Sequence, residues 1–332
     1  MIFYNVFSGH LTGKFREYYV KNLGDRKFNS LHSYWYFRNL PDEKVKEAFE
    51  ITKGNIMIDS GAFTAYADDN MKRTKVDVKE QKKGKKKKEF NINEYIEDYI
   101  NWINKWDSYV TCFGQMDVIP AGINDVYKIE ECCQKTWENY LYMTSRMNSP
   151  KKLLYTFHAG EDFKWLKQAL EYRDANGQPI EYMAIGGLVG KPTKVRTQFL
   201  DECFRIIKSS SNPNIKVHGF GVSSDKVWKK YPFESCDSFT PGMNANQGFT
   251  CEKGTTYRAP DYDLMFKPKG STKEEQEELD RLEALKDPET LERENNDRVD
   301  RKTKLLIHNI EYWTNLGNEI EKTNNSFKTG LF

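Results

Sequence analysis

The sequence predicts a (β/α)₈ TIM barrel, an α/β fold in which eight parallel strands alternate with helices. Short runs of β-forming residues alternate along the chain with longer helix-like stretches, and eight such runs are present. The 332 residues are enough for one barrel with an appendage. The predicted strands are Ile2–Phe7, Ser33–Phe37, Asn55–Asp59, Tyr109–Phe113, Leu153–Phe157, Tyr182–Ile185, Lys216–Gly219 and Cys236–Phe239.

Helices are expected between these strands, and some of them begin with residues that favour helix starts. Asn91 or Asn93 stands at the start of one predicted helix, and Thr193 stands at the start of another. The predicted helices include Pro41–Thr52, Ile92–Trp106, Ile123–Met147, Asp162–Arg173 and Lys194–Ser209.

Two charged segments interrupt the alternation. Residues 72–88, the basic segment, contain ten Lys or Arg residues without apolar periodicity, which predicts a flexible loop after the third strand. Residues 267–304 predict a charged helical excursion with a capping box of Ser271 and Glu274, followed by a closing helix from Lys304 to about Thr323. We therefore expect a catalytic barrel over residues 1–266 and a helical appendage over 267–332 that packs on it. The closing helix carries an apolar stripe, Leu306, Ile310, Trp313 and Ile320, with Leu316 beside it.

The composition argues for a folded, cytoplasmic protein. An aromatic content of 14% argues against a disordered chain, and the net charge is only +2. We find no apolar run of membrane-spanning length, and the start of the chain is typical of a first strand rather than a signal peptide. The six cysteines lack the spacing of metal ligands, which favours reduced, buried thiols and predicts no metal site.

Acidic residues fall at the ends of three predicted strands. Asp59, Asp117 and Asp237 would converge at one mouth of the barrel, because active sites of this fold lie at the carboxyl ends of the strands. Each residue also has a simpler explanation: Asp59 can cap a turn, and His158 and His218 can be structural histidines. The combination, with glycines that allow close approach of the backbone, favours a site for a flat, polar molecule.

Two motifs carry a resemblance to a known family. The string MIDSGAFTAY resembles the Asp-Ser-Gly-Gly-Phe motif of the tRNA-guanine transglycosylases, the queuine and archaeosine tRNA-ribosyltransferase superfamily. The string MAIGGLVGK resembles that family's Gly-Gly-Leu-Ala-Val-Gly motif, and QMDVIP stands where the family has its base-recognising Asp. The pattern, over roughly residues 1–248, is most similar to the shortened, phage-type relatives that place 7-deazaguanines in DNA.

The resemblance implies a role for each matching residue. Asp59 would be the general acid and base, and Asp117 would accept hydrogen bonds from the guanine edge. His158 stands near a family glutamine. The residues expected to act in catalysis are Asp59 and Asp237, and those expected to bind the substrate are Ser60, Phe63, Asp117, His158, Gly186, Gly187, Leu188, Gly219 and Gly221. Phe220 and Phe239 are further candidates for stacking on the base.

The sequence departs from the family pattern at two places. Thr240 occupies the position of the family's nucleophilic Asp, so three alternatives stay open: Asp237 is the nucleophile, Asp59 is the nucleophile, or base exchange is lost. The family's zinc site needs three clustered Cys and a His, whereas this chain has only Cys251 in that stretch and His308 far downstream. We therefore expect no zinc and no other cofactor, and the missing zinc module favours DNA over tRNA.

The basic segment fits a nucleic-acid partner. It follows closely on the DSGAF motif, so its cations are expected to lie over the barrel mouth and contact phosphates. A solvated insertion without a partner is the alternative. The expected nucleic-acid-binding residues are Lys72, Arg73, Lys75, Lys82, Lys83, Lys85, Lys86, Lys87 and Lys88.

These observations together predict a glycosyltransferase that exchanges guanine in DNA for a 7-deazaguanine such as preQ0. The alternatives are exchange in tRNA, an N-glycosidase that does not exchange bases, and a catalytically silent nucleic-acid-binding subunit. The expected partners are DNA or tRNA and the free base, without a membrane, and a homo-oligomer or a helper protein is compatible with the sequence. If a phage encodes the protein, it would act in the host cytoplasm.

Replacing the lysines of the basic segment with Gln should weaken DNA binding and flatten its salt dependence. Each lost phosphate contact should lower the slope of log affinity against log salt by about one. Fluorescence anisotropy with a labelled duplex over a salt series measures this slope. An unchanged slope would show that the basic segment does not contact phosphates.

Overall fold

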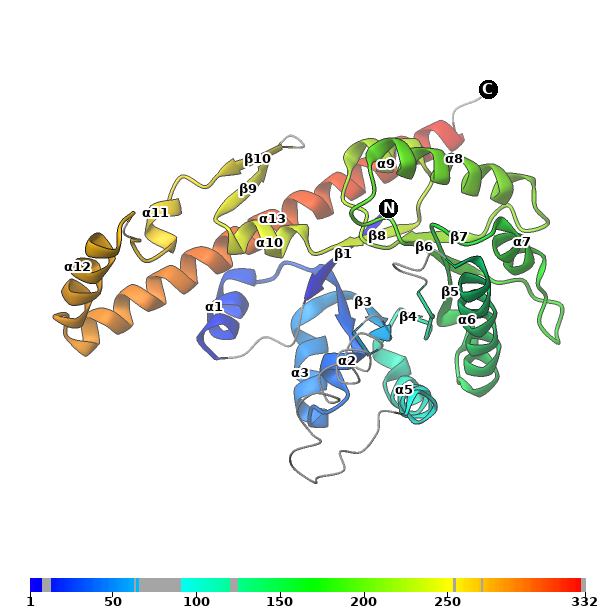
Figure 1. Cartoon of the computed structure of the whole chain (residues 1–332), viewed down its shortest axis with the longest axis horizontal. Helices are drawn as coiled ribbons and strands as arrows, with labels where there is room; N and C mark the ends of the chain where they lie inside the picture. The colour runs from blue at the N-terminus through cyan, green and yellow to red at the C-terminus, as the bar shows by residue number, and fades with distance from the viewer. Residues whose placement is uncertain are drawn as a thin grey trace.

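Eight parallel strands close into a barrel in sequence order, so the predicted (β/α)₈ class is confirmed (Figure 1). The computed structural model describes residues 1–7, 13–62, 64–65, 91–119, 125–252, 255–269 and 271–329. Strand β1 pairs in parallel with both β2 and β8, which closes the sheet on itself. The strands are β1 (Ile2–Phe7), β2 (Phe28–Ser33), β3 (Lys53–Asp59), β4 (Cys112–Gly114), β5 (Leu153–His158), β6 (Tyr182–Gly186), β7 (Lys216–Gly219) and β8 (Ser235–Ser238).

Side chains alternate between the inside of the barrel and the layer between barrel and helices. Every residue of β5 is buried, because both faces of a parallel barrel strand are covered. An inner cluster takes alternate residues from the strands and fills the barrel. It consists of Tyr4, Leu31, Met57, Cys112, Leu154 and Ala184.

Helices follow most strands and bury their apolar faces on the barrel. In α5 (Ile92–Trp106), buried residues recur at helical spacing, as in Tyr95, Tyr99 and Ile103. The remaining helices after β1 to β7 are α1 (Gly13–Leu23), α2 (Tyr34–Phe37), α3 (Asp42–Thr52), α6 (Val126–Arg146), α7 (Phe163–Glu171), α8 (Thr193–Ser209) and α9 (Asp225–Lys230), with 3₁₀ turns η2 (Asp107–Tyr109) and η3 (Pro150–Lys152).

The predicted strand Ser33–Phe37 is wrong, because β2 ends at Ser33 and Tyr34–Phe37 form α2. The aromatic run has high β propensity, but tertiary packing overrides it. Tyr34 is buried against Tyr99 of α5, with ring centroids 4.7 Å apart. Because Ser33 is the last residue of β2, it lies beside Asp59 in the strand register, at the site described below.

Smaller corrections concern the ends of elements. Strand β8 begins and ends one residue earlier than predicted, so Phe239 lies outside it. Strand β4 begins at Cys112 rather than Tyr109. Asn91 caps α5 as predicted, whereas Thr193 lies inside α8 rather than capping it.

After β8 the chain leaves the barrel before it returns as the last helix. It forms α10 (Thr240–Asn246), a hairpin of β9 (Phe249–Glu252) and β10 (Thr255–Arg258), α11 (Tyr262–Met265), α12 (Lys273–Ala284) and the long α13 (Pro288–Thr329). The capping box of α12 pairs Thr272 with Glu275, one residue beyond the predicted pair.

Helix α13 supplies the eighth helix of the barrel. It contacts α1, β1 and α9, which is the place between the first and seventh helices where the ring would otherwise be open. The predicted apolar stripe is buried along it. A Cβ at Gly317 would come within 2.9 Å of the Met1 carbonyl oxygen, so a glycine is needed where the helix crosses the start of β1.

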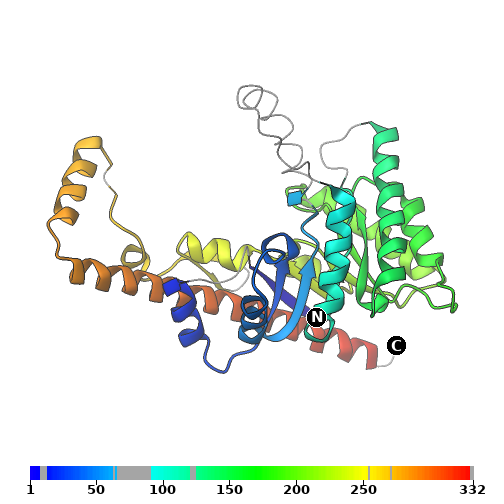
Figure 2. The same cartoon turned by 90° about the horizontal axis from the view of Figure 1, so that it is seen from below.

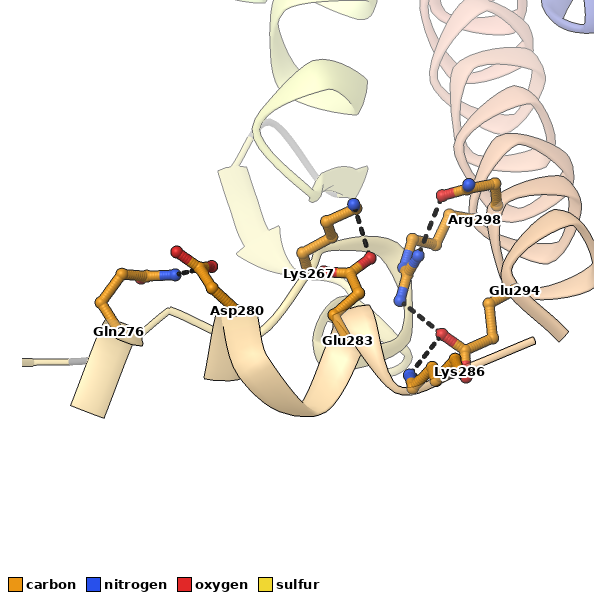
Figure 3. Close-up of polar contacts among 8 residues, drawn as sticks. Lys267, Gln276, Asp280, Glu283, Lys286, Glu294 and Arg298 are labelled. Atoms are coloured by element: carbon orange, nitrogen blue, oxygen red, sulfur yellow. Dashed lines mark hydrogen bonds and ion pairs between the residues drawn. The ribbon is translucent and has the colours of Figure 1, made fainter. Parts of the chain in front are cut away.

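The first part of α13 and α12 extend beyond the barrel as an arm (Figures 1 and 2). Ion pairs hold this arm together (Figure 3). Glu294 accepts from both Lys286 and Arg298, at 2.8 Å and 3.2 Å, and Lys267 pairs with Glu283 at 2.6 Å. The side chains of these pairs are partly or largely exposed to solvent, so each pair contributes little to the free energy of folding. Their main effect is to orient the arm. None of the described helices is long and apolar enough to cross a membrane.

Asn309 of α13 joins the barrel-closing helix to the segment after β8. It is fully buried; its Oδ1 accepts from the Cys251 amide at 2.9 Å, and its Nδ2 donates to the Phe249 carbonyl at 2.9 Å. Both partners are backbone groups at the start of the hairpin, and leaving such groups without a hydrogen bond inside the protein costs free energy.

Asn309→Ala should lower the free energy of unfolding by about 2–3 kcal/mol, because a buried backbone amide and a half-buried backbone carbonyl lose their partner. Urea unfolding followed by circular dichroism measures the change. Asn315→Ala, at an exposed position of the same helix, is the control and should change stability by less than about 0.5 kcal/mol. Equal effects of the two substitutions would contradict this account.

Candidate active site

Three acidic side chains from different strands meet at the carboxyl end of the barrel. Asp59 ends β3, Asp117 follows β4 by three residues, and Asp237 lies in β8. Asp117 and Asp237 are buried and Asp59 is half-buried, and the charges of Asp117 and Asp237 both act on Asp59. The convergence expected from their positions at strand ends is therefore present.

Asp59 is held at the end of a buried strand by the turn that follows. The Gly61 amide donates to Asp59 Oδ2 at 3.0 Å. Gly61 has φ of +73°, and a Cβ there would lie 2.7 Å from Trp35 Cβ, so only glycine fits this turn. On the neighbouring strand, Gly114 has no side chain to cover the Asp59 carboxyl group.

Burial raises the pKa of Asp59 to about 7, with a further contribution from the Asp117 charge and a smaller one from Asp237. The hydrogen bond from the Gly61 amide and the nearby Ser33 hydroxyl oppose the shift without cancelling it. At neutral pH the group is therefore divided between its acid and its base form. This is the property needed for a residue that both donates and accepts a proton.

A buried histidine bridges Asp117 and a fourth acidic residue. His158 Nε2 lies 2.8 Å from Asp117 Oδ2, and His158 Nδ1 lies 2.8 Å from Glu161 Oε1. Burial alone would lower the pKa of His158, but the bonds and charges of Asp117 and Glu161 outweigh it and raise the pKa to about 10. His158 is therefore a cation that donates to both carboxylates.

The surroundings of His158 leave little freedom for the ring. A Cβ at Gly186, its neighbour in the register of β5 and β6, would lie 2.9 Å from His158 Cδ2. Gly186 is thus required for the ring to lie flat against β6. Helix α6 holds the segment that carries Asp117, since Thr136 Oγ1 accepts from the Val118 amide and Asn139 Nδ2 donates to the Met116 carbonyl, both at 2.8 Å.

Asp237 is oriented by two donors to one of its oxygens. The Gly221 amide and His218 Nε2 approach Asp237 Oδ1 at 2.9 Å and 3.1 Å. Gly221 has φ of +67°, and a Cβ there would lie 2.5 Å from Val189 Cγ2. Asp237 Oδ2 makes no hydrogen bond with any described residue.

Thr240 begins α10 rather than projecting from a strand. Its hydroxyl interacts with Ser238 Oγ at 2.7 Å and with Ser223 Oγ at 3.0 Å. These bonds give it a local structural role at the start of the helix. Asp237 is therefore the acidic group that β8 brings to the rim.

The other residues expected in the site lie in different surroundings. Ser60 is fully buried, and its hydroxyl accepts from the Ala62 amide at 3.3 Å. Gly187 is exposed after β6 with φ of +71°, and Leu188 is buried beneath it. At Gly219 a Cβ would point outward, where it would lie 3.0 Å from both Cys236 Sγ and Phe233. Gly219 therefore does not line the mouth.

The aromatic residues expected to stack on the base also lie in different surroundings. Phe220 packs on His218, with ring centroids 4.6 Å apart, and belongs with the inner cluster, whereas Phe239 is 40% exposed at the end of β8. Phe63 and every Lys and Arg proposed for the basic segment (Lys72, Arg73, Lys75, Lys82, Lys83, Lys85, Lys86, Lys87 and Lys88) lie outside the described residues.

The structure adds residues that sequence reasoning did not assign to the site. Glu161 follows His158 by three residues and pairs with it, while Ser33 was hidden by the misplaced second strand. Ser235 lies two residues before Asp237, so strand alternation alone would have placed both on the inner face.

Zinc ligands of the kind that the resemblance would require do not come together here. Cys251 is buried and accepts from Asn244 Nδ2 at 3.0 Å, whereas His308 is exposed on α13. In the described part of the chain, no group of three or more His, Cys, Asp or Glu side chains has the arrangement of a metal site. The residues present therefore do not fit the family's zinc module.

The described rim is strongly acidic. Asp117 and Asp237 both act on Asp59, and Asp117 and Glu161 each bind one nitrogen of the cationic His158. Such a field stabilises positive charge that develops on a bound molecule. No protein-family model and no curated protein matches the chain.

Asp59→Asn should change how stability depends on pH. Because the folded protein binds the Asp59 proton more tightly than the unfolded chain, the contribution of Asp59 to the free energy of unfolding falls as the pH rises from about 4 to about 7. The Asn side chain does not ionise, so the variant does not lose stability in this way. Above pH 7 it should therefore be more stable than the unchanged protein, by on the order of 2 kcal/mol, whereas at pH 4 it should not be more stable.

Urea unfolding at a series of pH values measures this difference. Asp25→Asn, at an exposed aspartate, controls for the loss of one charge. Parallel stability profiles of the Asp59→Asn variant and the unchanged protein would show that the Asp59 proton is not linked to folding.

Proposed function

We propose that this protein is a guanine transglycosylase that exchanges guanine in DNA for a 7-deazaguanine such as preQ0. The observation that carries the proposal is Asp59: a carboxyl group with a pKa of about 7, under the influence of two further carboxylates at one barrel mouth. Base exchange needs a group that gives a proton to the leaving base and takes one from the incoming base.

The reaction divides into two displacements at the sugar. Asp237 attacks C1′, the C1′–N9 bond breaks, and guanine leaves with the bonding electrons and takes a proton from Asp59. The incoming base then gives its N9 proton to Asp59, its N9 attacks C1′, and Asp237 is released. Positive charge develops on the sugar in both steps, so the acidic rim favours both transition states.

Asp117 fits the recognition of a guanine edge. His158 occupies Asp117 Oδ2, and Oδ1 makes no hydrogen bond with any described residue. An acceptor in this position suits the N1–H or the exocyclic amine of guanine and would face a lone pair in adenine. Because His158 keeps its proton to high pH, it holds the Asp117 carboxylate in one orientation over the whole neutral range.

The acidic rim repels phosphates, so a nucleic acid needs compensating cations elsewhere. The basic segment, residues 72–88, stands in the sequence between β3, which ends at Asp59, and α5. Its charge favours a nucleic-acid substrate, and a target base would be extruded from a duplex to reach the carboxylates. The lack of a zinc module favours DNA, with tRNA as the second candidate.

The purified protein should incorporate labelled guanine or preQ0 into DNA when DNA and bulk tRNA are offered in parallel. Asp237→Ala should reduce exchange on the order of a thousandfold or more, because it removes the nucleophile, whereas Thr240→Ala should leave the rate close to that of the unchanged protein. Scintillation counting of the two nucleic-acid fractions measures the exchange.

Label in tRNA alone would replace DNA by tRNA as the substrate. Release of free guanine without incorporation would instead indicate a hydrolysing N-glycosidase. Loss of activity in Thr240→Ala but not in Asp237→Ala would overturn the assignment of the nucleophile.

A further inference from the structure

A chain of hydrogen bonds runs from Asp237 through the buried His218 and Ser235 to the half-buried Tyr182. His218 Nε2 lies 3.1 Å from Asp237 Oδ1, His218 Nδ1 lies 2.5 Å from Ser235 Oγ, and Ser235 Oγ lies 2.5 Å from the Tyr182 hydroxyl. We propose that His218, Ser235 and Tyr182 form a positioning relay that fixes Asp237 through Oδ1 and presents Oδ2 as its reacting oxygen. The catalytic part of this inference rests on the proposed function.

The protons of the relay have one consistent direction. Burial raises the pKa of Tyr182 well above its usual value, so its hydroxyl keeps its proton, and in the relay it donates this proton to Ser235 Oγ. The Ser235 proton then goes to His218 Nδ1, and His218 donates through Nε2–H to Asp237. In this arrangement each proton has one acceptor.

The other states of His218 fit less well. With the proton on Nδ1 alone, the Nε2 lone pair would face the Asp237 carboxylate at 3.1 Å. With both nitrogens protonated, His218 would donate to Ser235 Oγ and Ser235 would have to donate to the Tyr182 hydroxyl, which reverses the direction of both bonds. His218 is also fully buried, where an added charge is costly.

The relay accounts for the unequal surroundings of the two Asp237 oxygens. Oδ1 accepts from the Gly221 amide and from His218, which locks the plane of the carboxylate. Oδ2 has no such bond among the described residues and is therefore the oxygen left to attack a sugar carbon. A carboxylate held in this way meets its target without first losing rotational freedom.

The relay also differs from its apolar surroundings. The inner cluster beside it consists mainly of residues such as Met57, Leu154 and Ala184, and apolar side chains of this kind would pack there with less cost than the buried polar groups of His218 and Ser235. A fully bonded polar chain in this place orients the group at its end. Only its outer end reaches an acidic residue of the rim.

The direction of the relay is tested by NMR of the protein labelled with ¹⁵N-histidine. The chain has five histidines, and the His218 signals are assigned from their loss in His218→Gln. We expect Nε2 to carry a proton and Nδ1 to have the shift of a hydrogen-bond acceptor. A proton on Nδ1, with or without one on Nε2, would overturn the relay.

The functional effect is tested with Ser235→Ala and Tyr182→Phe, which leave Asp237 and its Gly221 contact in place. We expect kcat for base exchange to fall about ten- to a hundredfold in Ser235→Ala and less in Tyr182→Phe, with KM unchanged. Tyr155→Phe is the matched control, because the Tyr155 hydroxyl is buried and makes no hydrogen bond with a described residue.

Unchanged kcat in both relay variants would overturn the positioning role. A loss of stability with full kcat per folded molecule would do the same, since a merely structural chain behaves in this way. The NMR result does not depend on turnover, so a protein without exchange activity would contradict the proposed function while leaving the direction of the relay testable.

Discussion

Closure of eight parallel strands is the constraint on which the site depends. Because all the strands run in one direction, their carboxyl ends meet at one rim, and because side chains alternate, only every second residue faces inward. Asp59 and Asp237 meet both conditions, as does His158. A shift of β8 by one residue would turn Asp237 into the layer between barrel and helices and leave Cys236 in its place.

The acidic residues that lie close together at the rim change one another's ionisation. A carboxyl group that is buried near other carboxylates ionises at a higher pH than usual, and Asp59 is such a group, with the Gly61 amide as its hydrogen-bond donor among the described residues. Asp117 shares the cation of His158, and Asp237 has two donors. Three chemically identical side chains therefore have different neighbours, and this difference is the basis of the separate roles that we propose for them in proton transfer, recognition and attack on the sugar.

The last helix links the barrel to the arm. Helix α13 occupies the eighth helical position only after the chain has passed through α10, the β9–β10 hairpin, α11 and α12, so barrel closure and the position of the arm depend on the same helix. Asn309 and Gly317 make this possible, one by satisfying backbone groups of the hairpin and the other by allowing the helix to approach β1.

The sequence by itself determined the fold class, most of the strands and the acidic residues at their ends, because these depend on local periodicity and on a general property of parallel barrels. It also identified the apolar stripe of α13. Tertiary structure decided what local pattern could not: that Tyr34–Phe37 form a helix under α5, that Ser33 lies beside Asp59, and that Glu161 pairs with His158. It also decided the partners of Asp237, since His218, Ser235 and Tyr182 come from three strands whose relative register only barrel closure sets. Hydrogen bonds and pKa shifts arise between residues distant in the chain, and for this reason the sequence could place the carboxylates but not assign their different roles.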